Sequence, residues 1–240
     1  MRRSVAAVLT ALLSTAALAA SPGGAAQARG PAAAPREAAA AGRPVVFVHG
    51  RNADAGVWNS MIARFRAAGT PGDRLFAWSY DTAQPTNEVT AGLLAQYVDA
   101  VLRRTGASQV DIVAHSLGSL PSRWYVKFGG GRATVRHWVS LAGPNHGTGI
   151  ALLCALWDQG CKDMTPGSYV LTHLNSGDES PGSVDYTVLW SPCDETMLPQ
   201  NSPQLQGAHN VRTTCLKHND LLTDAAVAAK VRATLGADRM

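Results

Sequence analysis

Short runs of β-branched and aromatic residues alternate along this chain with segments whose apolar residues recur at helical spacing. The first run, Val45-Val46-Phe47-Val48, is apolar throughout, as is typical of a strand covered on both faces. Strands that alternate with helices favour a mostly parallel sheet with helices on both of its faces. The alternation therefore predicts an α/β fold that begins at Pro44.

The same reading places the remaining elements. Strands are expected at 45–48, 75–80, 110–114, 135–141, 186–190 and 210–214, and helices at 57–68, 88–105, 116–128 and 220–235. The segment 143–185 interrupts the alternation, because it holds several Pro and Gly, two cysteines and one short helix at 167–174. Long irregular segments often form binding loops, so we expect this one to be a wall of the site.

The first 43 residues differ in composition from the rest of the chain. Residues 1–28 resemble an export signal, with two arginines, an apolar stretch over 5–20 and an A-x-A-like cleavage site ending at Ala28; a competing site ends at Ala19. The stretch is short and broken by polar residues, so we expect release outside the cell and no stable membrane insertion. Residues 29–43 lack large apolar side chains and should form a flexible arm before one domain, 44–240.

A five-residue pattern, A-x-S-x-G over 114–118, lies between a predicted strand and a predicted helix. In a nucleophile elbow, small residues two before and two after the serine let strand and helix approach, which exposes the hydroxyl. The serine, Ser116, would also serve as an ordinary helix cap. Its context favours a catalytic nucleophile, which requires a base and a group that orients the base.

The partners of Ser116 are expected after later strands, first an acid and then a histidine. His218 follows the strand at 210–214 and precedes the last helix, whereas its competitor His209 comes before that strand. Asp194 directly follows the strand at 186–190. Other carboxylates for this role are Glu195, Asp185 and Asp178. We therefore predict Ser116, Asp194 and His218 as a catalytic triad.

Backbone amides must also stabilise the oxyanion of a tetrahedral intermediate. Leu117, directly after the nucleophile, supplies one N–H, and the loop after the first strand should supply the other. That loop begins His49-Gly50-Arg51, and the amide of Arg51 is the candidate donor.

Four cysteines lie in the part predicted to be exported, so two disulfides are expected. Of three possible pairings we favour Cys154 with Cys161, which are close in sequence, and Cys193 with Cys215, which flank the predicted acid and base. The cysteines form no CxxC pair, and no HExxH is present, so the sequence predicts no zinc site. Removing residues 1–28 leaves a nearly neutral chain without a Lys/Arg run, so no nucleic-acid partner is expected.

Five stretches together resemble the small secreted bacterial lipases and esterases of the α/β-hydrolase fold, the class 2 lipases: VVFVHGRNADAGVW, VDIVAHSLGS, VSLAGPNHGT, WSPCDETMLP and CLKHNDLL. The resemblance extends from about Pro44 to the final helix, and the elbow of this family also has Ala at its first small position. It implies carboxylic-ester hydrolysis without a metal or organic cofactor. It also implies the triad Ser116, Asp194 and His218, with Arg51 and Leu117 as oxyanion donors.

The sequence thus predicts a secreted, monomeric serine esterase or lipase that acts on a small-molecule ester or lipid through an acyl-enzyme. Hydrolysis of thioesters, polyesters or amides by the same triad is an alternative. A non-catalytic exported binding protein of the same fold is a second alternative. The segment 143–185 is longer and richer in Cys than in the smallest lidless relatives, so acyl chain length stays open.

Overall fold

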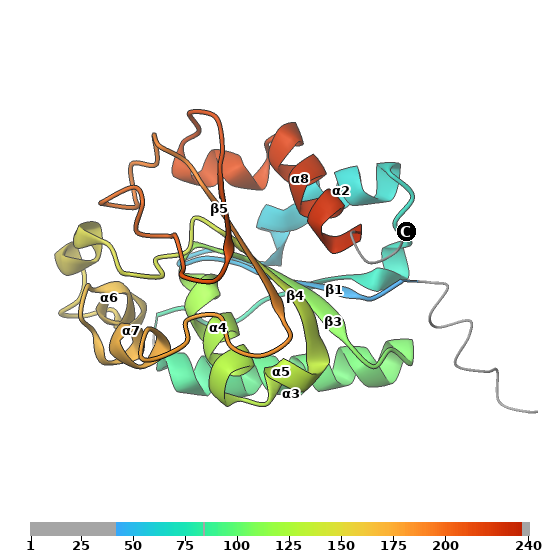
Figure 1. Ribbon diagram of the computed structural model, residues 1–240, viewed down its shortest axis with the longest axis horizontal. Coiled ribbons are helices and arrows are strands. Elements are labelled where there is room, and N and C mark those ends of the chain that lie inside the picture. Colours follow the sequence, from blue (N-terminus) through green and yellow to red (C-terminus); the bar gives the residue numbers. More distant parts are fainter. Residues whose placement is uncertain (1–41, 84, 237–240) are drawn as a thin grey trace, which may run out of the picture. The chain divides into compact units, whose positions relative to one another are not determined.

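The computed structural model describes residues 42–83 and 85–236. The predicted export signal, 1–28, and all of the predicted arm except residues 42 and 43 lie outside them. The strands in the described part form one parallel sheet with the order β2-β1-β3-β4-β5-β6 (Figure 1). They are β1 (Val45–Val48), β2 (Leu75–Trp78), β3 (Val110–His115), β4 (Val135–Leu141), β5 (Asp185–Trp190) and β6 (His209–Arg212). This parallel sheet, whose strands alternate with helices along the chain, confirms the predicted α/β class.

Helices cover both faces of the sheet (Figure 1). One face carries α2 (Asn59–Ala67) and α8 (Ala225–Gly236), and the other carries α3 (Asn87–Thr105) and α4 (Ser119–Phe128). Successive side chains of a strand point to opposite faces, so Val45 and Phe47 join the first core while Val46 and Val48 join the second. This burial of both faces explains why β1 is apolar at every position.

Three predicted helices begin with a separate tight turn instead of one continuous helix. Short 3₁₀ turns, η1 (Ala55–Trp58), η3 (Ser116–Gly118) and η5 (His218–Leu222), precede α2, α4 and α8. Apolar spacing does not separate a 3₁₀ turn from the first turn of an α-helix, because both place residues three apart on one side. The turns η3 and η5 matter most, since they hold the predicted nucleophile and base.

The predicted ends of two strands are also shifted. β2 ends at Trp78, two residues before the predicted end, and β6 spans His209–Arg212 where the sequence predicted 210–214. His209, the competing base, therefore opens β6, where its side chain is exposed.

The segment 143–185 is more helical than the sequence predicted. Besides α7 (Tyr169–Leu174), which was expected, it contains η4 (Gly149–Leu153) and α6 (Gln159–Met164). The side chain of Asp158 caps α6 by accepting a hydrogen bond from the Cys161 amide at 2.9 Å. Six residues are too few to show a helical period, so α6 was missed. A third apolar cluster packs α6 and α7 against α4; it includes Leu120, Cys161, Met164, Leu171 and Leu174.

Candidate active site

Ser116 lies at a sharp turn where β3 ends and η3 begins. Its φ of 51° is in the left-handed region, which a residue with a side chain adopts at a cost. Gly118, two residues on, has no room for a side chain, because an added Cβ would overlap the carbonyl oxygens of Val48 and His49. The close approach of β1 to the turn therefore requires glycine here, as expected for a nucleophile elbow.

His218 and Asp194 lie close together beyond the carboxyl ends of the strands. The Nδ1–H of His218 donates to Oδ2 of Asp194 at 2.8 Å, and Oδ1 of Asp194 accepts from the amides of Thr196 and Met197 at 2.9 and 3.0 Å. Burial alone would raise the pKa of the Asp194 carboxyl, but the His218 hydrogen bond and charge and the two amides outweigh it. The net effect is a pKa below the usual value, so the carboxylate stays ionised.

A cavity of about 650 Å³ opens at this end of the sheet. Its lining includes Ser116 and His218, and also Arg51 from the loop after β1. Asp194 is not part of the lining; it lies behind His218, with 1% of its surface exposed. Another part of the lining comes from η4, α6 and Cys154 between them, and includes Ile150, Ala151, Cys154, Cys161 and Met164. The segment 143–185 therefore does form a wall of this cavity.

A neutral histidine supports the backbone of His218. The Nε2–H of His115 donates to the His218 carbonyl oxygen at 3.3 Å, and the ring centroids of the two histidines are 4.7 Å apart. Burial, and then the proximity of His218, lowers the pKa of His115 to about 3. His115 therefore stays uncharged above acidic pH. Sequence reasoning excluded His115 as the base and assigned it no other role.

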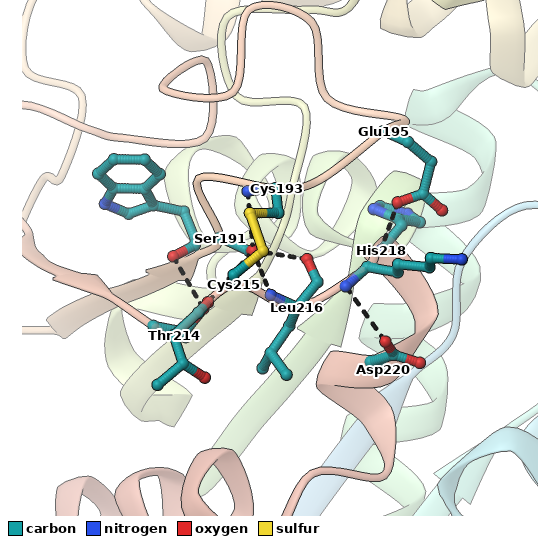
Figure 2. Close-up of a disulfide and its surroundings, with 11 residues drawn as sticks. Ser191, Cys193, Glu195, Thr214, Cys215, Leu216, His218 and Asp220 are labelled. Carbon is teal, nitrogen blue, oxygen red and sulfur yellow. Dashed lines mark hydrogen bonds between the residues drawn. A yellow bond between two sulfur atoms is a disulfide. The ribbon is translucent and has the colours of Figure 1, made fainter.

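A disulfide and one serine join the loop that carries Asp194 to the loop that carries His218 (Figure 2). Cys193 and Cys215 form the disulfide, which is one of the two that we favoured. The Ser191 hydroxyl donates to the Leu216 carbonyl at 2.5 Å and accepts from the amides of Leu216 and Cys193 at 2.9 and 3.2 Å. Sequence reasoning missed Ser191, because no motif marks a serine that bonds only to backbone.

The other candidate acids occupy different places. Glu195 accepts a hydrogen bond from the backbone amide of His218 at 3.1 Å (Figure 2), whereas the hydrogen bond of the His218 ring goes to Asp194. Asp185 opens β5 and pairs with Arg136 at 2.7 Å, and Asp178 lies exposed in a loop. Of these carboxylates, Asp194 is the one that contacts the His218 ring.

The loop after β1 is held by several hydrogen bonds. Nδ1–H of His49 donates to the Gly50 carbonyl at 2.9 Å, and Nε2 accepts from the Tyr80 amide at 3.2 Å. The Tyr80 hydroxyl donates to the His49 carbonyl at 2.7 Å, and its ring stacks on the imidazole. The Asn52 amide donates to the Thr82 hydroxyl at 3.0 Å. Arg51 lies between these anchored residues and lines the cavity.

The second disulfide, Cys154–Cys161, closes a loop in the wall that faces Arg51. This is also the pairing that the sequence favoured. Within the described residues, no helix is both long enough and apolar enough to cross a membrane.

Comparisons with known proteins agree with this architecture. Residues 42–235 match the family described as Lipase (class 2). The fold resembles the mature form of Bacillus licheniformis lipase BlEst2, at 17% identity and a TM-score of 0.70 over 81% of this chain and 92% of that chain. Aspergillus fumigatus lipase B is similar at 18% identity and a TM-score of 0.69, over 81% of this chain and 52% of that chain.

A third solved structure, the esterase RhEst1 from Rhodococcus sp. ECU1013, gives 16% identity and a TM-score of 0.56 over 82% of this chain and 91% of that chain. At such identities the structural likeness establishes the fold alone, whereas the family match covers almost the whole described chain. The chain thus belongs to the class 2 lipases and is a hydrolase of carboxylic esters.

Proposed function

We propose that this protein is a secreted serine esterase or lipase that works through an acyl-enzyme, with Ser116 as nucleophile, His218 as general base and acid, and Asp194 as the group that orients the base. One observation carries the proposal: the serine of a strained elbow and an imidazole hydrogen-bonded to a buried carboxylate line the same cavity. His115 also lines this cavity, but its ring bonds to the His218 backbone, whereas the His218 ring bonds to a carboxylate, as a catalytic base requires.

The hydrogen bond to Asp194 assigns the proton positions on His218. Because Nδ1–H donates to the carboxylate, Nε2 carries the free lone pair. Nε2 accepts the Ser116 proton as Oγ attacks the ester carbonyl carbon. The resulting oxyanion is stabilised by the amides of Arg51 and Leu117, which together are worth several kcal/mol at roughly 3 kcal/mol per donor.

Collapse of the tetrahedral intermediate breaks the bond to the alcohol oxygen, which takes the proton from Nε2 of His218. An acyl group then remains on Ser116 Oγ. Water attacks this acyl carbon and gives its proton to the same Nε2, and the second collapse returns the proton to Oγ as the carboxylic acid leaves. Asp194 remains ionised throughout and stabilises the imidazolium.

Export is proposed from two features together. Residues 1–28 have the composition of an export signal, and two disulfides join all four cysteines, as is typical of proteins in oxidising compartments. The mature enzyme is proposed to begin after Ala19 or Ala28, which mass spectrometry of the protein from a culture medium would decide.

The direct test is Ser116→Ala with a soluble short-chain nitrophenyl ester. We expect kcat to fall by about 10⁴-fold or more with the fold intact by circular dichroism, because the attacking oxygen is removed. An organophosphonate probe should label the native protein, but neither the variant nor the heat-denatured protein. Ester hydrolysis that survives in the folded variant would overturn the proposal, and a native Ser116 that resists the probe would favour a binding protein.

A panel of esters, thioesters and amides of rising acyl length would test the linkage. The cavity volume of about 650 Å³ is in the range of small-molecule sites, and the match to the class 2 lipases favours esters as the preferred substrates. Rates measured above and below the solubility limit of each ester would show whether a lipid surface activates the enzyme.

A further inference from the structure

A four-residue stretch of the segment 143–185, residues 158–161, contacts both residues whose amides are the proposed oxyanion donors. Asp158 is the first contact: its Oδ2 accepts from Nε and Nη2 of Arg51, at 2.8 and 2.7 Å. The Asp158 side chain is 7% exposed, so the carboxylate of this ion pair is shielded from water, whereas the Arg51 side chain is 29% exposed. The two residues are 107 positions apart in the chain, so folding alone brings them together.

The second contact is made by Gly160 against Leu117. A Cβ at Gly160 would lie 2.8 Å from Cδ2 of Leu117 and 2.8 Å from the carbonyl oxygen of Thr82. Real Cβ atoms do not approach so closely, so the loop reaches Leu117 only because this residue is glycine. The neighbouring Gln159 amide also donates to the Ala83 carbonyl at 3.1 Å. The stretch is thereby fixed to the loop that binds Asn52.

The stretch itself is rigidly held. The Cys154–Cys161 disulfide closes a loop with a sequence separation of 7, and the Cys161 amide donates to Oδ1 of Asp158 at 2.9 Å. One oxygen of Asp158 is thus occupied by α6 and the other by Arg51. The carboxylate cannot rotate toward water without losing both sets of hydrogen bonds.

We propose that Asp158 is a positioning residue for catalysis, which acts by tethering the Arg51 side chain so that the Arg51 amide points at the oxyanion. This inference rests on the proposed function, because it takes the amide of Arg51 as a donor. An oxyanion donor is effective only within a few tenths of an ångström of its correct place, and a misplacement of 1 Å can cost about 100-fold in rate. The guanidinium attaches the loop to the cap of α6, whereas the hydrogen bonds of His49 and Asn52 attach it to Tyr80 and Thr82.

The test is Asp158→Asn, which keeps an oxygen to cap α6 and removes the charge that binds Arg51. With a soluble short-chain ester we expect kcat to fall about tenfold while KM stays within about twofold, because a donor to the transition state is misaligned but substrate contacts remain. The control is Asp185→Asn, which breaks an ion pair of the same 2.7 Å length with an arginine, Arg136, of the same 29% exposure, outside the cavity lining; the Asp185 side chain is 48% exposed against 7% for Asp158.

A trifluoromethyl ketone gives a readout that a merely structural role would not move. Ser116 adds to its carbonyl to form a tetrahedral oxyanion, so its inhibition constant should weaken by the same factor as kcat/KM in Asp158→Asn. Arg51→Met keeps the amide but removes the tether, and should match Asp158→Asn. The double variant should be little worse than either single one, and Arg51→Lys should restore part of the activity.

The possible results distinguish failure of the proposed Asp158–Arg51 tether from failure of the proposed function. If Asp158→Asn behaves like Asp185→Asn, or if its loss lies in KM alone, the tether is wrong. If Asp158→Asn folds poorly, the kinetics of Arg51→Met test the tether instead. The Arg51 side chain is partly exposed, so replacing it leaves no cavity in the core. If Ser116→Ala is still active, or the native protein hydrolyses no ester, the proposed function fails before the tether is tested.

Discussion

The two disulfides restrain the chain in different ways: Cys154 and Cys161 line the cavity, whereas Cys193 and Cys215 lie outside its lining. Cys193–Cys215 joins the loops after two neighbouring strands, with a sequence separation of 22, whereas Cys154–Cys161 closes one short loop with a separation of 7. The first is exposed at the surface, but the proposed acid and base beside it are buried. The second has a buried cysteine facing the cavity.

Their surroundings differ as well. Around Cys193–Cys215, hydrogen bonds join backbone groups to the side chains of Ser191, Glu195 and Asp194. The loop closed by Cys154–Cys161 presents apolar side chains to solvent, and Leu156 is 93% exposed. The comparison indicates that the first disulfide holds the loop of the proposed acid against the loop of the proposed base. The second shapes the wall of the cavity that contacts the proposed oxyanion loop.

The largest expected effect is on the loops joined by Cys193–Cys215, which carry the proposed acid and base. Asp194→Asn leaves the shape of the side chain but removes the charge that holds the His218 Nδ1 proton, so kcat should fall by about 10⁴-fold with little change in KM. Asp178→Asn, which replaces an exposed carboxylate in the loop after α7, is the control and should match the native rate within about twofold. Steady-state kinetics would decide it, and a loss below about tenfold in Asp194→Asn would remove this residue from the mechanism.

Opening each disulfide separately would sharpen the comparison. A disulfide stabilises a fold by reducing the chain entropy of the unfolded state, and more so for a longer loop. Replacing Cys193 and Cys215 by Ser should therefore lower the free energy of unfolding by about 3 kcal/mol. The same replacement of Cys154 and Cys161 should lower it by about 2 kcal/mol. The first pair should also reduce kcat more, because it holds the acid loop against the base loop. Urea denaturation and kinetics on both double variants would check the order. A reversed order in kcat would break the proposed division of roles.

The smallest effect concerns pH and the buried His115. Because burial lowers its pKa from 6.5 to about 3, its uncharged form stabilises the fold fully above pH 6.5, and this contribution is lost as the pH falls toward 3. Between pH 7 and pH 5 the native protein should therefore lose about 1 to 2 kcal/mol from this group, and His115→Asn should not.

The control is His173→Asn in α7. His173 is exposed on α7, so its replacement should leave the pH dependence of unfolding as in the native protein. Denaturant midpoints at pH 7, 6 and 5 for the three proteins would provide the test. Parallel curves for His115→Asn and the native protein would show that this histidine is not held neutral by the fold.

Much of the fold followed from local sequence patterns. The continuous apolar run at 45–48 predicted a strand buried on both faces, and β4 spans the predicted residues, Val135–Leu141. The pattern at 114–118 placed Ser116 between a strand and a helix, because an elbow needs only short-range residues. The helix α6 escaped prediction, because its six residues follow a polar cap and show no helical period.

The sequence by itself determined the alternation of strands and helices, the elbow, and the candidate residues Asp194 and His218, all of which depend on neighbouring positions in the chain. Only the tertiary structure decided that Asp194, and not Glu195, contacts the imidazole, because the two neighbours differ in direction rather than in chemistry. It also decided that Asp158 meets Arg51, since contacts between distant residues arise from packing of the sheet and its loops, which no local pattern encodes.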